Sequence, residues 1–332
     1  MKAAVLSDGG WGTALALTLA TNGHDVHLWG PFPEYVAEMA RRRENVRFLP
    51  GVPLPERLVL TGMMADAVAG ADVIVLASPS QYMRAILVQL ASRAYRSDAV
   101  FVDVAKGIEV GTLLRMSELA AECISPARYA VLSGPSHAEE VARGIPTTVV
   151  AASDNADVAA TVQAFFMNDV FRVYTSEDVA GVELGGALKN VLALAAGICD
   201  GMGFGDNTKA ALMTRGIVEM ARLGVALGGR AETFSGLSGI GDLIVTCMSR
   251  HSRNRRVGEE LGQGRSLDDI IQNMGGQVAE GVRTTDSAYR LAQREGVDVP
   301  IIRQVHAALY EGIDPRDAVR QLMTREAKSE ND

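Results

Sequence analysis

Residues 2–16 read KAAVLSDGGWGTALA, and this stretch decides the fold of the N-terminal half. The apolar run at 2–6 predicts a strand, the glycines predict a tight turn, and the alanine-rich continuation predicts a helix. A dinucleotide-binding unit begins in this order, with a G-x-G-x-x-G turn that lets the backbone approach a pyrophosphate at the helix N-terminus. The stretch therefore predicts a dinucleotide site at the start of the chain.

The turn departs from that pattern at its beginning. Gly9 and Gly12 fill the second and third glycine positions, whereas Ser7 stands at the first and Asp8 follows it. A small polar residue tolerates a tight turn, but a carboxylate near a pyrophosphate repels it unless the side chain turns away. An ordinary strand-to-helix turn is the alternative interpretation. The candidate cofactor contacts here are Gly9, Gly10, Trp11 and Gly12.

The choice between NAD and NADP is expected at the end of the second strand, about 20 residues further on. Residues 27–31 read HLWGP there, with no acidic side chain to hydrogen-bond a ribose hydroxyl. Because nothing at this position repels a 2′-phosphate, the sequence favours NADP over NAD.

Strand-like and helix-like segments alternate through the first half of the chain. Runs such as DVIVLA at 72–77 are apolar throughout, which is typical of parallel strands covered on both faces. After about residue 177, helical periods rich in alanine, leucine and glycine replace them. We predict an α/β fold, with a doubly wound Rossmann-like domain at 1–178 and an all-helical substrate-binding domain at 179–332. The predicted strands are 2–7, 25–30, 58–62, 72–78, 99–105, 129–133, 146–152 and 171–175.

Composition narrows the classes of function. The chain has 332 residues and a net charge of -8, which disfavours nucleic-acid binding because counterion release needs a basic face. Its three cysteines are far apart and its five histidines lack metal-ligand spacing, so we expect a reducing cytoplasm and no metal. No secretion signal or membrane insertion is expected, and the apolar helical half predicts a homodimer.

Lys189 stands in an unusual environment for a lysine. Its neighbours three and four positions away on a helix are Gly185, Gly186, Leu192 and Ala193. None of them is charged, and burial on such a face lowers a lysine's pKa, which makes it a usable general acid or base. A lysine that extends from a buried helix to solvent is the alternative. Asn190 beside it can add an amide contact to a substrate.

Two further segments place polar groups where strands end. Lys106 follows the predicted strand at 99–105, and ligands bind at the carboxyl ends of such strands. SGPSHA at 133–138 ends another strand, although Ser136 and Glu139 also fit a simple helix cap.

The helical half contributes two polar segments. Asp242 in GIGD at 239–242 is either a functional carboxylate or a helix cap. HSRNRR at 251–256 combines hydroxyl, guanidinium and amide groups at a predicted helix start, which suits a phosphate dianion. A solvated basic face is the alternative for that run.

Together these segments resemble the bacterial-type glycerol-3-phosphate dehydrogenases, which use NAD or NADP. The resemblance implies reversible hydride transfer between NAD(P)H and dihydroxyacetone phosphate, giving sn-glycerol 3-phosphate for phospholipid synthesis. The usual glycine and alanine of the family are replaced by Ser7 and Asp8, which bears on cofactor affinity. The segments that carry the resemblance are the N-terminal turn, NVRFLP at 45–50, AKG at 105–107, SGPSHA at 133–138, GGALKN at 185–190, GIGD at 239–242, SRNRR at 252–256 and VAEG at 278–281.

The resemblance also implies roles for individual residues. Lys189 is implied to be the catalytic lysine, which protonates the ketone oxygen as hydride arrives. Lys106 is implied to lie near both substrate and nicotinamide, and Asp242 to hold the substrate and the charge of the catalytic lysine. The other implied substrate contacts are Gly134, Ser136, Ser252, Arg253 and Asn254, and the implied cofactor contacts are Gly10, Trp11, Ala138, Arg253, Val278 and Glu280.

Two other functions fit the same two-domain plan. A dehydrogenase of a hydroxy acid or a ketopantoate-like substrate would grip a carboxylate, for which a phosphate cradle at 252–254 is not needed. A dinucleotide sensor without catalytic activity is suggested by Ser7 and Asp8, but Lys189, Lys106 and Asp242 argue against it.

Overall fold

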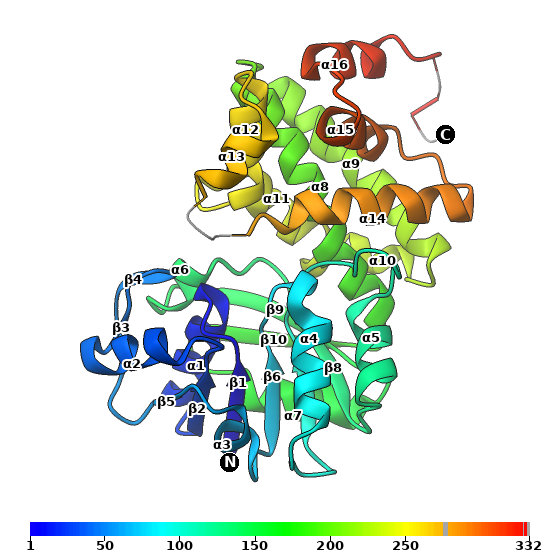
Figure 1. Cartoon of the computed structure of the whole chain (residues 1–332). Coiled ribbons are helices and arrows are strands. Elements are labelled where there is room, and N and C mark those ends of the chain that lie inside the picture. Colours follow the sequence, from blue (N-terminus) through cyan, green and yellow to red (C-terminus); the bar gives the residue numbers. More distant parts are fainter. Residues whose placement is uncertain (275–277, 328, 331–332) are drawn as a thin grey trace.

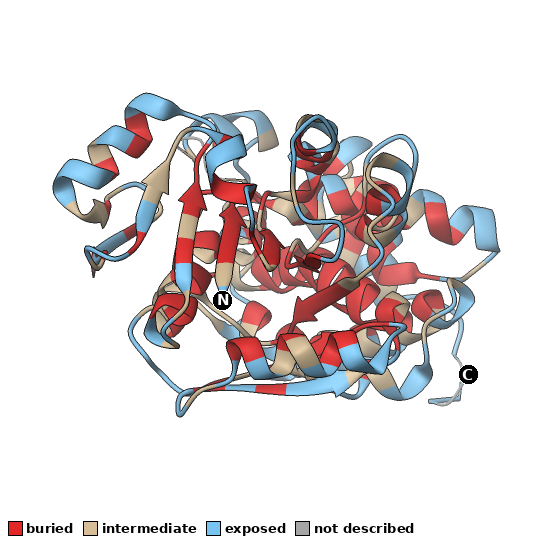
Figure 2. Cartoon of the chain, turned by 90° about the horizontal axis from the view of Figure 1, so that it is seen from below, coloured by how far each residue is buried: buried red, intermediate tan, exposed pale blue. Residues whose placement is uncertain are grey.

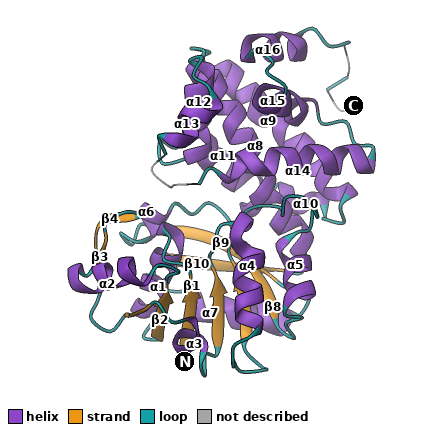
Figure 3. Ribbon diagram, viewed as in Figure 1, coloured by secondary structure: helices purple, strands orange, loops and turns teal. Residues whose placement is uncertain are grey.

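The computed structural model describes residues 1–274, 278–327 and 329–330. Figure 1 shows a sheet half at the bottom and a helical half above it, and the carboxyl ends of the central strands face the helical half. Figure 3 shows that the strands drawn lie in the lower half, whereas the upper half consists of helices. The chain passes from one half to the other between Ser176, the last residue of β10, and Val179, the first of α8.

Strands and helices alternate up to β10, except that β3, β4 and β5 follow one another without a helix between them. The strands are β1 Lys2–Leu6, β2 Asp25–Trp29, β3 Glu44–Asn45, β4 Leu49–Pro53, β5 Val59–Thr61, β6 Val73–Leu76, β7 Val100–Asp103, β8 Tyr129–Ser133, β9 Thr147–Ala152 and β10 Phe171–Ser176. The helices are α1 Gly10–Thr21, α2 Pro33–Arg42, α3 Met64–Val68, α4 Ser80–Ala91, α5 Met116–Cys123, α6 Ala138–Val141, α7 Ala156–Phe166, α8 Val179–Gly201, α9 Asp206–Ala226, α10 Ala231–Phe234, the π-turn η1 Leu237–Gly241, α11 Asp242–Met248, α12 Arg253–Gly262, α13 Leu267–Gln272, α14 Glu280–Glu295, α15 Pro300–Tyr310 and α16 Pro315–Met323.

The eight predicted strands form one sheet in the order β10-β9-β8-β7-β6-β1-β2-β5. The order reverses at β1, as in doubly wound folds, so the predicted fold class is confirmed. Six of the seven neighbouring strand pairs in this sheet run parallel, whereas β8 and β9 pair antiparallel. The connection between them, residues 134–146, carries only the short helix α6, which packs on α1 instead of crossing the sheet.

The sequence analysis did not predict α3 or the small β3–β4 pair. α2 has the signals of a helix, because Pro33 opens it and Tyr35, Val36 and Met39 form its buried face. β3 and β4 pair with each other outside the main sheet. Since β3 has only two residues, no alternation of apolar and polar side chains could reveal it.

Helices cover the sheet on both faces. The core against α1 and α7 includes Ala3 and Val5 of β1, and the core against α3, α4 and α5 includes Ala4 and Leu6 of the same strand. Figure 2, seen from the sheet end, shows that the central strands are buried and that the outer faces of the surrounding helices are exposed. Both faces of β1 are therefore apolar, and the strand ends at the glycine turn.

The helical half is organised around α8. This helix is long and apolar enough to cross a membrane by length and composition, but its apolar window is completely buried inside the structure. It packs most closely on α12, where a Cβ at Gly197 would lie 1.9 Å from the carbonyl oxygen of Arg255. A Cβ at Gly258 would likewise lie 2.0 Å from the carbonyl oxygen of Leu194. The two backbones meet because both positions lack side chains, and this contact fixes the start of α12 relative to Lys189.

Candidate active site

Lys189 lies in the middle of α8 and is buried, with 6% of its surface exposed. Its Nζ donates hydrogen bonds to Oδ1 of Asp242 at 2.7 Å and to Oγ1 of Thr246 at 2.8 Å. Burial lowers the pKa of Lys189 to about 8, even though the carboxylate of Asp242 favours the charged amine. The amine can therefore gain or lose a proton near neutral pH, which a general acid or base requires.

Asp242, the first residue of α11, is shared by two lysines. Its Oδ2 accepts from Nζ of Lys106 at 2.7 Å, while Oδ1 accepts from Lys189. Burial acts to raise the pKa of Asp242, but the two ammonium groups outweigh it and hold the pKa below its ordinary value. The side chain of Asp242 caps no helix, so the capping interpretation was wrong. The site holds one carboxylate between two cations.

Lys106 comes from the loop after β7 and reaches the loop after β8. Its Nζ also donates to the carbonyl oxygen of Gly134 at 2.9 Å and to Oγ of Ser136 at 3.3 Å. The alternative interpretation of Ser136 as a helix cap was wrong, because α6 begins at Ala138 and its N-cap residue is His137. The loops after β7 and β8 therefore meet at Lys106, because the carboxyl ends of parallel strands lie at the same edge of a sheet.

A chain of amides joins Lys189's neighbour to α12 and α14. Asn190 donates from Nδ2 to the carbonyl oxygen of Lys106 at 3.0 Å and accepts at Oδ1 from Nδ2 of Asn254 at 2.8 Å. Oδ1 of Asn254 accepts from the backbone N–H of Gly281 at 2.9 Å. These bonds fix Asn254 and leave one of its two amide hydrogens available.

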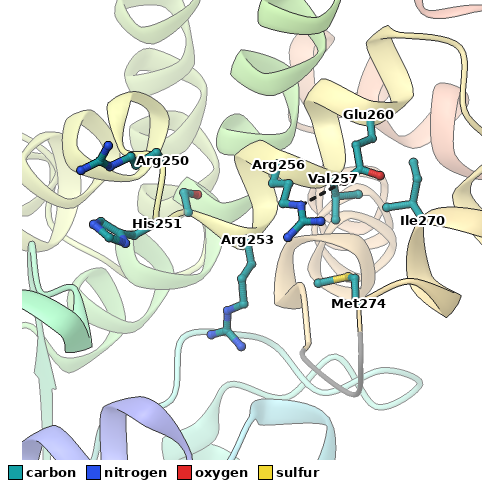
Figure 4. Close-up of a pocket in the computed structure, with 9 residues that line it drawn as sticks. Arg250, His251, Arg253, Arg256, Val257, Glu260, Ile270 and Met274 are labelled. Carbon is teal, nitrogen blue, oxygen red and sulfur yellow. Dashed lines mark hydrogen bonds and ion pairs between the residues drawn. The ribbon is translucent and has the colours of Figure 1, made fainter. Parts of the chain in front are cut away.

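The start of α12 lines a small cavity of ≈ 160 Å³, shown in Figure 4. Ser252 is the N-cap residue and accepts from the backbone N–H of Arg255 at 3.2 Å. Arg253 is exposed, and in Figure 4 its side chain extends from α12 toward the sheet half. Arg256 instead pairs with Glu260 on the same helix. Of these arginines, Arg253 is the one that faces the interface between the halves.

The glycine turn presents a cradle for a dinucleotide. A Cβ at Gly10 would lie 2.6 Å from the carbonyl oxygen of Phe48 and 3.7 Å from Ala138, and a Cβ at Gly12 would lie 2.1 Å from the carbonyl oxygen of Ser7. Only glycine fits these two positions. Oδ2 of Asp8 and Nε1 of Trp11 are buried and have no hydrogen-bond partner among the described residues. A cradle closed to side chains and lined by unpaired polar atoms fits a bound dinucleotide.

Glu280, the first residue of α14, reaches the sheet half from the helical half. Oε1 of Glu280 accepts from the backbone N–H of Ser80, the first residue of α4, at 2.9 Å. Val278 is half-buried and lies just before α14. Glu280 therefore links the two halves through a helix N-terminus of the sheet half.

Two family models match the chain. "NAD-dependent glycerol-3-phosphate dehydrogenase N-terminus" matches residues 2–159, and "NAD-dependent glycerol-3-phosphate dehydrogenase C-terminus" matches residues 178–320. The chain belongs to the NAD-dependent glycerol-3-phosphate dehydrogenase family. The C-terminal model begins next to the start of α8, and the N-terminal model ends within α7.

Relatives in this family match the chain over nearly its whole length. The glycerol-3-phosphate dehydrogenase [NAD(P)+] of Prosthecochloris aestuarii is 52% identical over 329 residues, covering 98% of each chain. The crystal structure of glycerol-3-phosphate dehydrogenase from Coxiella burnetii superposes with a TM-score of 0.93 at 39% identity, covering 98% of this chain and 99% of that one. A ketopantoate reductase from Ralstonia eutropha, at 17% identity and a TM-score of 0.61 over 96% of this chain and all of that one, shares the fold alone.

The sequence analysis missed two side chains close to Lys189. Thr246 accepts from Lys189 and donates to the carbonyl oxygen of Asp242 at 2.6 Å. Its position four residues after Asp242, one helical turn on, was the available signal. His137 has a lowered pKa because of its burial and the charge of Lys189, and its Nε2 has no partner in the described structure. No sequence spacing connects His137 with Lys189, because they belong to different halves.

Proposed function

We propose that this chain reduces dihydroxyacetone phosphate to sn-glycerol 3-phosphate, reversibly, with NAD(P)H as the hydride donor and Lys189 as the general acid. The observation that carries this proposal is the buried ammonium of Lys189, held by Asp242 and Thr246 between the two halves of the molecule. Membership of the family and relatives with this activity in their names support it.

Lys189 has one proton to direct at a substrate. An ammonium has three N–H donors, and those toward Asp242 and Thr246 are in use. No third acceptor lies on Nζ among the described residues. The ketone oxygen would take that third place, so that the proton passes to it as negative charge develops there. In the reverse direction the neutral amine would remove the proton from the hydroxyl group.

Lys106 and Asp242 set the electrostatics of this step. One carboxylate between two ammonium groups leaves the cluster with a net positive charge. Burial strengthens the attraction between this charge and a forming alkoxide. Gly134 and Ser136 accept hydrogen bonds from Lys106 and would line the substrate's side of the cluster.

The phosphate of the substrate would lie at the start of α12. Ser252, Arg253 and Asn254 offer a hydroxyl, a guanidinium and an amide there, next to the amino end of a helix. The amide chain through Asn190 ties this cradle to Lys106. Because the phosphate takes no part in the reaction, its binding would serve to orient the carbonyl group toward Lys189.

The cofactor would lie on the glycine turn. The backbone from Gly9 to Gly12, with Trp11, would receive the pyrophosphate, and Ala138, Val278, Glu280 and Arg253 would contact it from the other sides. When bound, the nicotinamide supplies the hydride for the carbonyl carbon. The residues of the turn bind and orient the cofactor, while Lys189 donates or accepts the proton.

Cellular location, assembly and domain bounds are proposed together with this reaction. We propose a cytoplasmic homodimer that provides sn-glycerol 3-phosphate for glycerophospholipid synthesis, and whose domains are residues 1–178 and 179–332. Size-exclusion chromatography with light scattering measures the dimer directly.

An absorbance assay at the nicotinamide band tests the proposed function. Dihydroxyacetone phosphate should be reduced with NADH or NADPH, whereas dihydroxyacetone without its phosphate should be a far poorer substrate. Faster turnover of ketopantoate or a 2-oxo acid would favour a related dehydrogenase. Nucleotide binding without turnover of any of these ketones would favour a sensor.

A further inference from the structure

The end of β2 offers no side chain of its own to a dinucleotide. In doubly wound folds, an acidic residue there hydrogen-bonds the hydroxyls of the adenosine ribose and so favours NAD over NADP. In this chain β2 ends at Trp29 and Gly30 follows, so the strand supplies neither a carboxylate nor an arginine at that point.

The carboxylate of Asp8 occupies the place that a side chain at position 30 would fill. A Cβ built on Gly30 would lie 2.3 Å from Oδ2 of Asp8, 2.6 Å from its Cγ and 2.7 Å from Cγ2 of Val36. The turn is held beside the strand end, because the backbone N–H of Ser7 donates to the carbonyl oxygen of Trp29 at 3.0 Å. A carboxylate on the β1–α1 turn thus stands at the end of β2.

This carboxylate has an unused hydrogen-bonding capacity. Asp8 is 5% exposed, and its Oδ2 has no donor among the described residues. The nearby donors are engaged elsewhere: Asn45 donates to the carbonyl oxygen of Asp8 and to Oγ1 of Thr13, and the hydroxyl of Tyr35 donates to Asn45. A buried acceptor without a donor is costly, so a ligand hydroxyl that pairs with it gains stability.

We infer that Asp8 is a specificity-determining residue that accepts a hydrogen bond from the adenosine ribose and disfavours a 2′-phosphate, so that the chain prefers NADH to NADPH. The inference rests on the proposed function, because it concerns the cofactor of that reaction. It reverses the preference that the end of the second strand suggested, because the carboxylate comes from the turn instead of from the strand.

The charges around Asp8 agree with this assignment. Burial raises the pKa of Asp8 to about 6, and the cation of Arg47 acts to lower it, so the group is an anion above neutral pH. Arg47 is exposed and its guanidinium lies 4.5 Å from the centre of the Tyr35 ring. Once the carboxylate is removed, Arg47 remains as a partner for a 2′-phosphate.

Binding measurements separate this inference from catalysis. Calorimetric titration of the full chain at pH 8 with NADH and NADPH, and with ADP-ribose and its 2′-phosphate, reports on the ribose contact without turnover. We expect NADH to bind the wild type at least about tenfold more tightly than NADPH, because an unpaired buried anion repels the phosphate. Asp8→Asn, which has nearly the same shape, should lose most of that preference.

Asp25→Asn is the matched control, since it removes the same charge from the exposed opposite end of β2 and should keep the preference. Circular dichroism checks that each variant is folded. The ratio of NADH to NADPH affinity in the wild type tests the inference even if a variant does not fold. Equal affinities in the wild type, a preference for NADPH, or an unchanged ratio in Asp8→Asn would overturn the inference and leave the proposed reaction standing. Failure to bind either nucleotide would overturn both.

Discussion

The two sides of the interface between the halves differ in how completely their polar groups are paired. At the start of α11, Asp242 accepts short hydrogen bonds from both Lys189 and Lys106, and Thr246 is a further partner of Lys189. On the sheet side, the turn keeps an unpaired carboxylate oxygen at Asp8. The substrate side is therefore organised before any ligand binds, whereas the cofactor side is completed by its ligand.

Backbone conformation shows the same contrast. Ser7 has φ 130°, in the region that favours glycine, and it is the only described non-glycine residue with so large a positive φ. Conformations of this kind cost about 1–3 kcal/mol and persist where the surroundings enforce them. Lys189 and Asp242 lie in regular helices. Catalytic geometry is thus held on helices, whereas the turn carries backbone strain at Ser7.

Removal of the catalytic amine should have the largest effect on activity. Lys189→Ala leaves Asp242 paired with Lys106, so the fold should survive, but it removes the proton donor. We expect kcat for dihydroxyacetone phosphate reduction to fall about 10²–10⁴-fold, with the Kd for NADH nearly unchanged. Steady-state kinetics and calorimetry measure the two quantities. Lys209→Ala is the control, because it removes a lysine that pairs with Asp200 away from the cluster. Near-normal turnover by Lys189→Ala would mean that Lys189 is not the general acid.

Asp242→Asn tests the side of the interface whose polar groups are paired, because it removes the anion that Lys189 and Lys106 share. It leaves two buried ammonium groups without their shared anion, which should cost about 3–5 kcal/mol of unfolding free energy and lower the pKa of Lys189 further. The optimum for ketone reduction should therefore move to lower pH. Asp200→Asn is matched, because Asp200 also joins two cations, Lys209 and Arg255, and it should lose stability with no shift of the optimum. An unshifted optimum in Asp242→Asn would separate Asp242 from the proton step.

Arg253→Ala tests the phosphate cradle. Loss of one charge-assisted hydrogen bond should raise KM for dihydroxyacetone phosphate about tenfold to a hundredfold, with a smaller change in kcat. Arg256→Ala, on the same helix but paired with Glu260, should leave KM close to that of the wild type. Equal effects of the two substitutions would mean that net charge, and not the position of Arg253, governs binding.

Ser7→Gly should have the smallest effect. Glycine adopts φ 130° without steric cost, so the free energy of unfolding should rise by about 1 kcal/mol, measured by urea denaturation. Ser7→Ala keeps the strain and should bring no such gain. If both variants gave the same stability, the turn would not be strained by its side chain.

The sequence predicted the sheet because its strands are continuous apolar runs, and it predicted the environment of Lys189 because helical spacing lists a residue's neighbours. It could not predict the antiparallel β9, since periodicity contains no information on strand direction. The contact between Asp8 and Gly30 was also out of reach, because the direction of a side chain in a turn depends on φ at Ser7. Thr246 could have been predicted, because it lies one helical turn after Asp242 in the sequence.

The pH dependence of kcat/KM in both directions is the most direct test of the central claim, that a buried amine at Lys189 carries the proton. Its pKa is lowered to about 8 by burial. Reduction needs the protonated amine, so its rate should fall tenfold per unit as pH rises above about 8. Oxidation of sn-glycerol 3-phosphate needs the neutral amine, so its rate should rise with pH up to about 8 and level off above it. Rates that change in the same sense in both directions, or that do not change between pH 7 and 9, would contradict the claim.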